Sequence, residues 1–162
     1  MLEAVRRSYA VDAVRAECLL DELIAFLRAA LPRLRAASSS VPREAELARR
    51  YAGLHRLAGA ADAGMTLDVP ADMMDARFPP GVLLPLLDDA LRALAGPCTL
   101  TAALTRGACR LLLTLPARPS EPVVARVRAL LADVYGALAE LKIDDDASGL
   151  FGVTVQVTQE LA

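Results

Sequence analysis

The stretch from Pro79 to Arg92 reads PPGVLLPLLDDALR, and it decides how the rest of the chain is interpreted. Prolines followed by a run of leucines are typical of an apolar helix that begins soon after a turn. Two adjacent carboxylates, Asp88 and Asp89, interrupt the apolar surface of this helix. Charged side chains are rarely buried without a partner, so the pair needs either solvent or a functional role. It is therefore the first candidate for a functional site.

Length and charge limit what the protein can be. A chain of 162 residues is long enough for one large domain or two small ones with a buried core. No apolar run reaches the roughly 18 residues of a membrane span, and residues 1–17 lack the apolar centre of a signal peptide. We therefore expect a cytoplasmic protein with no membrane segment in this chain. The formal net charge of -2 provides no basic footprint, so we expect no nucleic-acid partner.

The cysteines predict no metal or disulfide site. Cys18, Cys98 and Cys109 are odd in number, widely spaced and without the Cys-x-x-Cys spacing of metal and redox sites. We expect all three to be buried free thiols.

The first third of the chain predicts a helical hairpin. Apolar residues spaced by three and four positions predict one long helix from about Ala4 to Arg35. The serines of Ala36–Ser40 predict a break and can cap a second helix with Pro42 in its first turn, where Tyr51 and several leucines share one face. Such a hairpin, assigned to residues 1–60, often completes a four-helix bundle by dimerising.

The pattern changes to strands and helices after residue 60. The expected strands are 65–69, 99–105, 109–115, 139–143 and 150–158, and the expected helices are 80–95 and 123–138. Arg106–Gly107 predicts a tight turn and Asp144–Gly149 a longer one. The order predicts an α+β protein in which an N-terminal helical hairpin precedes an α/β sandwich over residues 61–162, with helices on one face of a mixed sheet.

Several segments resemble the LytS/YehU-type sensor histidine kinases in order and spacing. They are Leu23–Arg28, Glu44–Tyr51, Pro79–Leu91, Tyr135–Leu141 and Gly152–Val155. The similarity extends from about residue 9 to residue 157. It implies a helical dimerisation hairpin followed by an ATP-binding domain of the GHKL fold, acting in two-component signalling. It also implies four catalytic elements, each of which can be checked here.

Two of these elements concern the phosphoacceptor and the magnesium site. By spacing, the family's Pro-His-Phe phosphoacceptor falls upstream of Met1, and the only histidine, His55, is expected to be an ordinary surface residue of the second helix. Where the family has Glu-Asn-Ala, this chain has Asp88-Asp89-Ala90. Asp89 could ligate Mg²⁺, but its charge beside a triphosphate costs on the order of 1 to 4 kcal/mol. Asp88 is one methylene shorter than the family's Glu, which displaces a general base.

The other two elements are glycine-rich, and this chain lacks both. In place of Asp-x-Gly-x-Gly it has PARPSEP at 116–122, where prolines remove amide donors and no glycine lets the backbone approach phosphates. In the Gly-x-Gly-Leu segment that opens the next helix, Val123-Val124 occupy the last two places, and the lid before it is almost absent. No glycine nest remains for phosphate. The family's last Gly-Thr survives in part as Gly152-Val153.

Three hypotheses follow from these departures. The first is a catalytically degenerate pseudokinase with no cofactor and no catalytic residue, in which Asp88 and Asp89 mark a vestigial Mg-ATP site. It would bind a response regulator, a kinase or its own copy as a homodimer through the hairpin. The second is a histidine kinase fragment that binds Mg-ATP in an altered site through the same two carboxylates, with its phosphoacceptor upstream. The third is a phosphotransferase that uses His55.

Overall fold

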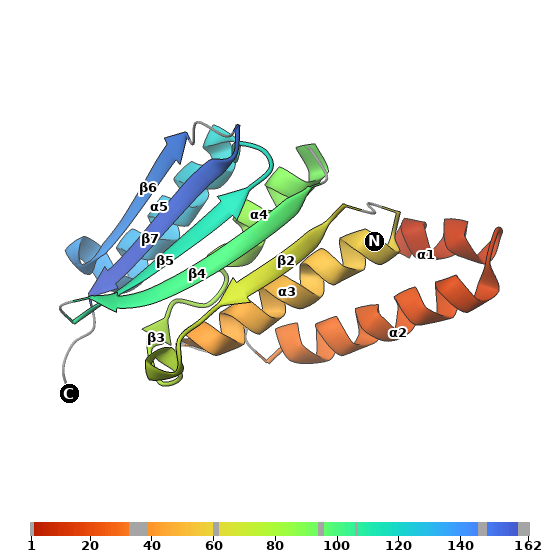
Figure 1. Cartoon of the computed structure of the whole chain (residues 1–162), viewed down its shortest axis with the longest axis horizontal. Helices are drawn as coiled ribbons and strands as arrows, with labels where there is room; N and C mark the ends of the chain where they lie inside the picture. Colours follow the sequence, from red (N-terminus) through yellow and green to blue (C-terminus); the bar gives the residue numbers. More distant parts are fainter. Residues whose placement is uncertain are drawn as a thin grey trace.

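A five-stranded sheet forms the centre of the described part of the chain, which in this computed structural model comprises residues 2–32, 39–59, 62–93, 96–105, 107–145 and 149–158. The strands lie in the order β2 (Gly64–Asp68), β4 (Pro97–Thr105), β5 (Ala108–Leu115), β7 (Phe151–Thr158) and β6 (Ala139–Asp145). β2 pairs parallel to β4 and the other neighbours pair antiparallel. The sheet is mixed, as predicted (Figure 1).

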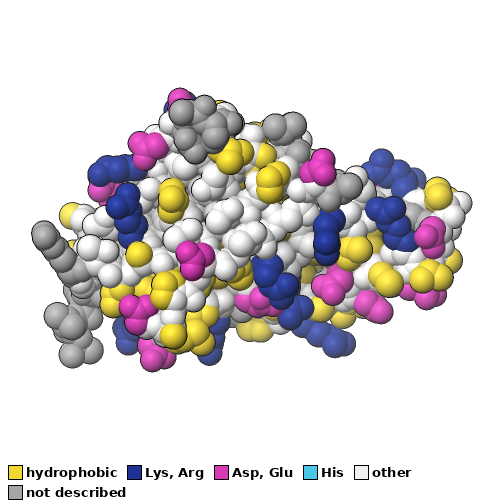
Figure 2. Space-filling view, in the orientation of Figure 1, with side chains coloured by type: hydrophobic (Ala, Val, Ile, Leu, Met, Phe, Trp, Pro, Cys, Tyr) yellow, Lys and Arg dark blue, Asp and Glu magenta, His cyan; other side chains and the backbone are white. Residues whose placement is uncertain are grey.

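One face of this sheet is buried and the other is open. Leu100, Leu113 and Val153 are paired across β4, β5 and β7, and all three are inaccessible to solvent or nearly so. The next residue of β5, Leu112, is 38% exposed because successive side chains of a strand point to opposite faces. Figure 2 shows basic and acidic side chains interspersed on the face turned to the viewer.

Three helices complete the sandwich. In Figure 1, α4 (Leu83–Ala93) and α5 (Glu121–Tyr135) lie behind the sheet, and α3 (Val41–Leu57) runs beside β2. α4 buries one apolar face, which consists of Leu83, Leu86, Leu87, Ala90 and Leu91. The predicted layering of helices on one face of a mixed sheet is confirmed.

The predicted single helix from Ala4 to Arg35 is wrong, because the described part of this segment forms two helices. α1 (Leu2–Tyr9) folds back on α2 (Ala13–Ala30). Asp12 is the N-cap of α2, and its carboxylate accepts a hydrogen bond of 3.1 Å from the backbone N–H of Arg15. An N-cap residue takes an extended backbone, so the helix cannot continue through it. Residues 33–38 lie outside the described residues.

The serines before α3 do not act as predicted. Ser40 is the N-cap of α3 but makes no side-chain capping hydrogen bond. Ser39–Ser40 instead form β1, which pairs antiparallel with β3 (Arg77–Phe78). β1, β3 and the short 3₁₀ helix η2 (Ala71–Met73) had no prediction, whereas η3 (Gly136–Leu138) is a 3₁₀ turn at the end of the predicted helix 123–138.

α3 connects the N-terminal helices to the sandwich. It packs antiparallel to α2, as the predicted hairpin requires, and also against β2 and α4. Val41, Ala45, Ala48 and Ala52 of α3 belong to the main core, whereas Leu54 packs in a second cluster with α1 and α2. The boundary at residue 60 stays a prediction, and α3 contributes to the packing on both sides of it.

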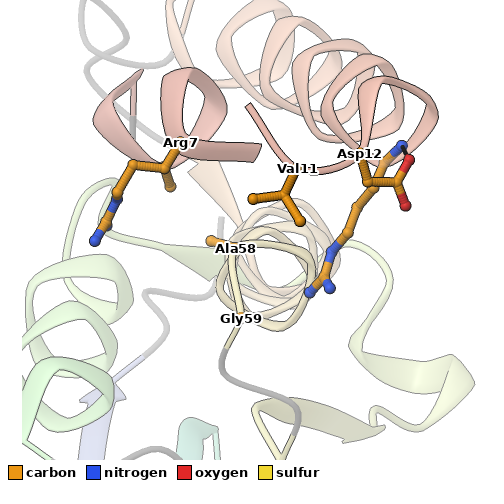
Figure 3. Close-up of a pocket in the computed structure, with 7 residues that line it drawn as sticks. Arg7, Val11, Asp12, Ala58 and Gly59 are labelled. Atoms are coloured by element: carbon orange, nitrogen blue, oxygen red, sulfur yellow. Dashed lines mark hydrogen bonds between the residues drawn. The ribbon is translucent and has the colours of Figure 1, made fainter. Parts of the chain in front are cut away.

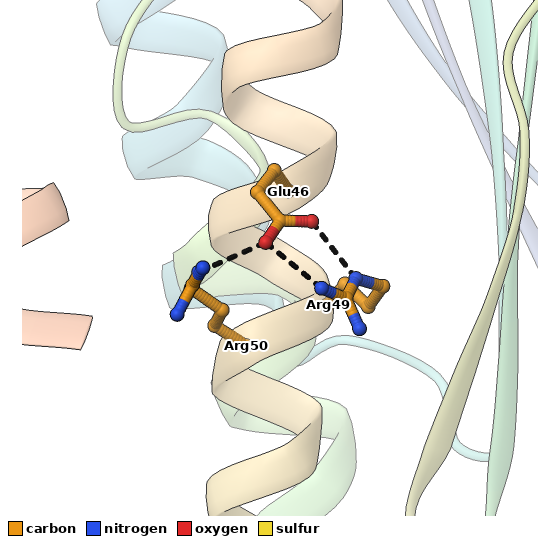
Figure 4. A network of polar contacts seen from close by, with 3 residues as sticks. All are labelled: Glu46, Arg49 and Arg50. Atoms are coloured by element: carbon orange, nitrogen blue, oxygen red, sulfur yellow. Dashed lines mark hydrogen bonds and ion pairs between the residues drawn. The ribbon is translucent and has the colours of Figure 1, made fainter. Parts of the chain in front are cut away.

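Charged residues fix the two sides of α3. On the outer side, Glu46 accepts hydrogen bonds of 2.8 to 2.9 Å from Arg49 and Arg50, one turn further along the helix (Figure 4). On the inner side Glu44 is 1% exposed, and its Oε2 accepts a 3.2 Å hydrogen bond from the backbone N–H of Gly81. Gly81 has φ 78°, a conformation that favours glycine. Glu44 thus holds the turn that precedes α4.

The cysteine prediction is correct for two positions. Cys98 and Cys109 are buried, and burial raises the pKa of the Cys98 thiol to about 11 and that of Cys109 to about 12. Cys18 is exposed on the outer side of α2, so the prediction is wrong there. In the described residues no helix combines the length and hydropathy that a membrane span needs.

The two faces of β5 offer a test of this architecture. We expect Leu111→Ala to lower the free energy of unfolding by about 2 to 5 kcal/mol, because it opens a cavity in the core. The matched control, Leu112→Ala on the open face, is expected to cost about 1 kcal/mol or less. Urea denaturation followed by circular dichroism measures both, and equal losses would contradict the assignment of the buried face.

Candidate functional site

Asp88 lies where α4 meets α3. Its Oδ1 accepts a hydrogen bond from the Tyr51 hydroxyl of α3 and another of 2.7 Å from Arg92 Nε, one turn further along α4. His55 Nε2, also on α3, lies 3.9 Å from the same oxygen. The carboxylate is therefore held by side chains of two helices.

These contacts shift the ionisation of the whole group. Partial burial acts to raise the pKa of Asp88, but the hydrogen bonds from Tyr51 and Arg92 outweigh it and hold the pKa below its usual value. Burial and the Asp88 carboxylate raise the pKa of Tyr51 well above the ordinary tyrosine value, so its hydroxyl keeps its proton. Burial also lowers the pKa of His55 below its ordinary value, although Asp88 opposes this. At pH 7 the group contains an ionised Asp88 and a neutral His55.

Asp89 faces the other neighbour of α4. Its Oδ2 accepts a hydrogen bond of 2.5 Å from the backbone N–H of Ser120, the N-cap residue of α5. The side chain of Ser120 makes no capping hydrogen bond. A carboxylate at this end of a helix is favourable, because unpaired N–H groups and the helix dipole make the end positive. Asp89 supplies the cap from outside the helix.

Two polar contacts, one to α4 and one to β6, fix the loop between β5 and α5. Asp89 binds its last residue, Ser120, and Arg118 Nη1 lies 3.3 Å from Asp145 Oδ1 at the end of β6. Within the first turn of α5, the amides of Val123 and Val124 donate to the Ser120 carbonyl, and Pro122 has no N–H. The loop is short, two of its residues are prolines without an N–H, and the Ser120 amide is already bound to Asp89.

An open cavity of about 300 Å³ lies between α4 and the start of α5. It is lined by Tyr51, Leu84, Pro85, Asp88, Asp89, Val123 and Arg126. A second hollow of about 290 Å³ follows along the same two helices and shares Pro85 and Arg126 with it. The first lies at the small end of the range of about 300 to 1,000 Å³ for ligand pockets. It brings together both carboxylates that the sequence selected.

A larger hollow of about 400 Å³ contains none of the predicted site residues. It lies between α1, the start of α2 and the end of α3, where Val11 points toward Ala58 and Arg7 extends along one side (Figure 3). Arg15, which also lines it, donates hydrogen bonds of 3.2 and 3.1 Å to the Leu57 carbonyl. This arginine therefore joins α2 to the end of α3.

His55 is not the surface residue that the sequence predicted. Its side chain is only 16% exposed, and Nε2 is buried without a hydrogen-bond partner. A buried nitrogen beside a carboxylate is poorly placed to receive a phosphoryl group. Among the described residues, no group of three or more His, Cys, Asp or Glu side chains is arranged to hold a metal ion.

The sequence located the two carboxylates but missed their partners. Tyr51 and His55 are one turn apart on a predicted helix, as are Asp88 and Arg92, and these spacings were the only available signal. Ser120 and Arg126 carried no signal, because their role depends on how α5 packs beside α4.

The overall shape matches solved histidine kinase structures. The catalytic domain of histidine kinase ThkA gives a TM-score of 0.55 at 10% identity, covering 75% of this chain and 94% of that one. The chain has the fold of a histidine kinase catalytic domain. The Acinetobacter baumannii histidine kinase AdeS gives a TM-score of 0.58 at 14% identity, covering 96% and 84% of the two chains. ThkA in complex with the response regulator TrrA gives 0.55 at 10% identity, covering 90% of this chain and 49% of that one.

Identities this low show the fold alone. No family model and no curated protein matches the sequence. The expected histidine-kinase-like α+β fold is thus confirmed, whereas the LytS/YehU type and the loss of catalysis require an argument from the site itself.

The contact between Asp89 and α5 can be tested by substitution. We expect Asp89→Ala to lower the free energy of unfolding by about 0.5 to 2 kcal/mol, since it removes the cap of α5. Asp133→Ala, at an exposed position near the other end of α5, is the matched control and should have a smaller effect. Denaturant unfolding measures both, and an unchanged stability of Asp89→Ala would contradict the capping role.

Proposed function

We propose that this chain is a degenerate histidine-kinase-like protein of the LytS/YehU type, which acts by protein contact in a two-component pathway and transfers no phosphate. The observation that carries the proposal is the contact between Asp89 and Ser120. The start of a helix is a natural site for an anion such as a phosphate group. Here a carboxylate of the protein already lies at the start of α5.

The electrostatics of the cavity also disfavour a triphosphate. Asp88 and Asp89 line it with only Arg126 as a cation among the described lining residues. Each negative charge a few ångströms from a polyanion costs about 1 to 4 kcal/mol near a protein surface. The first turn of α5 offers few donors to compensate, because Pro122 has no N–H and the Ser120, Val123 and Val124 amides are engaged within the protein. The residues present therefore do not fit Mg-ATP, and we assign no catalytic step to them.

One observation favours the alternative, an ATP-binding kinase fragment with an altered site. The cavity beside Asp88 and Asp89 is open, and carboxylate oxygens are ligands that Mg²⁺ accepts. In that case a phosphoacceptor histidine would have to come from a segment upstream of residue 1. The buried Nε2 of His55 argues against the third hypothesis, a phosphotransferase that uses this residue.

Calorimetry separates the first two functions. We expect no binding of Mg-ATP tighter than roughly 1 mM, because the sequence lacks both the glycine-rich segments that cradle phosphate and the neutral magnesium ligand. Asp89→Asn restores a neutral amide and is expected to gain no measurable affinity, since the glycine-rich segments are still missing and the Val123 and Val124 amides remain bound to Ser120. A dissociation constant of about 10 μM or lower for the natural sequence would overturn the proposal.

The proposed partners are a response regulator and a second copy of the chain. One of the similar structures is a histidine kinase bound to its response regulator, and this supports the first partner. For the second, α2 and its C-cap residue carry a stripe of apolar side chains that other described elements leave partly uncovered: Leu20, Ile24, Leu27 and Leu31. Their spacing of four, three and four residues is that of a coiled-coil seam. We propose that this stripe pairs with its copy in a homodimer in the cytoplasm.

Sedimentation velocity tests the dimer. Ile24→Glu and Leu27→Glu place a charge in the seam, and we expect each to shift the chain from dimer to monomer. Val14→Glu is the control, because Val14 is 71% exposed on α2 but lies outside the stripe. A natural chain that is monomeric at about 100 μM would contradict the homodimer. The apolar stripe on α2 would then be the proposed binding surface for the response regulator.

A further inference from the structure

Tyr51 lies where three helices meet. Its ring centroid is 5.5 Å from that of Phe26 on α2 and 4.9 Å from that of His55, its neighbour one turn along α3. Its hydroxyl donates to Asp88 on α4. A single side chain thus touches α2 with its ring and α4 with its hydroxyl, and movement of α2 changes the packing of this ring.

A further potential donor, His55, lies beside the oxygen that Tyr51 and Arg92 use. His55 Nε2 is buried without a hydrogen-bond partner and lies 3.9 Å from Asp88 Oδ1. That oxygen already accepts from Tyr51 and Arg92. A neutral imidazole donates from one nitrogen only, whereas the protonated ring donates from both. Protonation would therefore favour a hydrogen bond from His55 Nε2 to Asp88 Oδ1, which would compete with the hydrogen bond from Tyr51.

We propose that Asp88 is a two-position switch, bound by Tyr51 in one state and by protonated His55 in the other, and that the contact of Phe26 with Tyr51 lets the position of α2 bias the choice. The two states have different donors on one acceptor, which gives the discrete alternatives that coupling between distant elements requires.

The charges around His55 set the direction of the switch. Burial holds the pKa of His55 below its usual value, and the charge of Arg92 acts in the same direction, whereas Asp88 opposes them. The Tyr51 hydroxyl, the other titratable group in contact, stays protonated at neutral pH. The Tyr51 state therefore dominates at pH 7. Acidification below the ordinary histidine range, or loosening of Tyr51 by movement of α2, favours the His55 state.

The switch would change the wall of the cavity between α4 and α5. Tyr51 and Asp88 both line this cavity, whereas Phe26 and His55 do not. Loss of the Tyr51 hydrogen bond would free its ring to move and would turn Asp88 toward His55. A signal in the N-terminal helices would thus reach the cavity without any nucleotide.

An NMR pH titration of His55 tests the switch. Because His55 is the only histidine of the chain, its ring signals need no assignment. We expect Asp88→Asn to lower the titration midpoint of His55 by about 0.5 unit or more, since it removes the negative charge that stabilises the imidazolium. Tyr51→Phe should raise the midpoint by a similar amount, because a competing donor is lost. Phe26→Leu should raise it by less, because it only loosens Tyr51.

Tyr135→Phe, at the end of α5, is the matched control and should leave the midpoint unchanged. A midpoint that does not respond to Asp88→Asn or to Tyr51→Phe would overturn the switch, and an unchanged midpoint in Phe26→Leu would remove α2 from it. Circular dichroism establishes that each full-length variant is folded. The inference does not rest on the proposed function, because calorimetry with Mg-ATP and sedimentation test that function separately.

Discussion

The packing of α4 on the sheet constrains everything around it. Its leucines must face the strands to fill the core, and successive residues of a helix are about 100° apart. Asp88 and Asp89 therefore point away from the sheet in two different directions, one toward α3 and the other toward α5. A pair of carboxylates that is adjacent in sequence consequently serves two separate helices. The buried apolar face of α4 and the outward direction of its two carboxylates both follow from the periodicity of the helix.

Much of the fold could be predicted because apolar residues alternate along most strands and recur with a period near 3.6 along most helices. β4 and β5 were placed to within two residues at each end, since their turn at Gly107 separates two alternating runs. The first helix was misjudged because apolar spacing continues past Asp12, and only the local capping geometry reveals the break. β1 and β3 could not be predicted, because two-residue strands carry no period and depend on a partner far away in the chain.

The sequence predicted which carboxylates form the site but not which side chains and backbone groups they bind. Charge and position selected Asp88 and Asp89, yet their partners come from α3 and from the loop before α5, whose approach depends on tertiary packing. His55 shows the limit most clearly, because a lone polar residue on a helix gives no sign of whether its face is covered. What resembles a nucleotide-binding helix by sequence acts in this structure as the junction of three helices.

The parallel pairing of β2 with β4 has a consequence for how the chain folds. β4 and β5 are close in sequence and can pair locally. The pairing of β2 with β4 instead requires that α4 and its flanking loops, which connect these two strands, have already folded across the sheet. Contacts between residues far apart in sequence form late, because chain entropy must be lost before they add stability. We therefore expect the β4–β5 hairpin to nucleate folding and β2 to join late. Since α3 packs on β2 and α2 packs on α3, the N-terminal helices would find their place only at the end of folding.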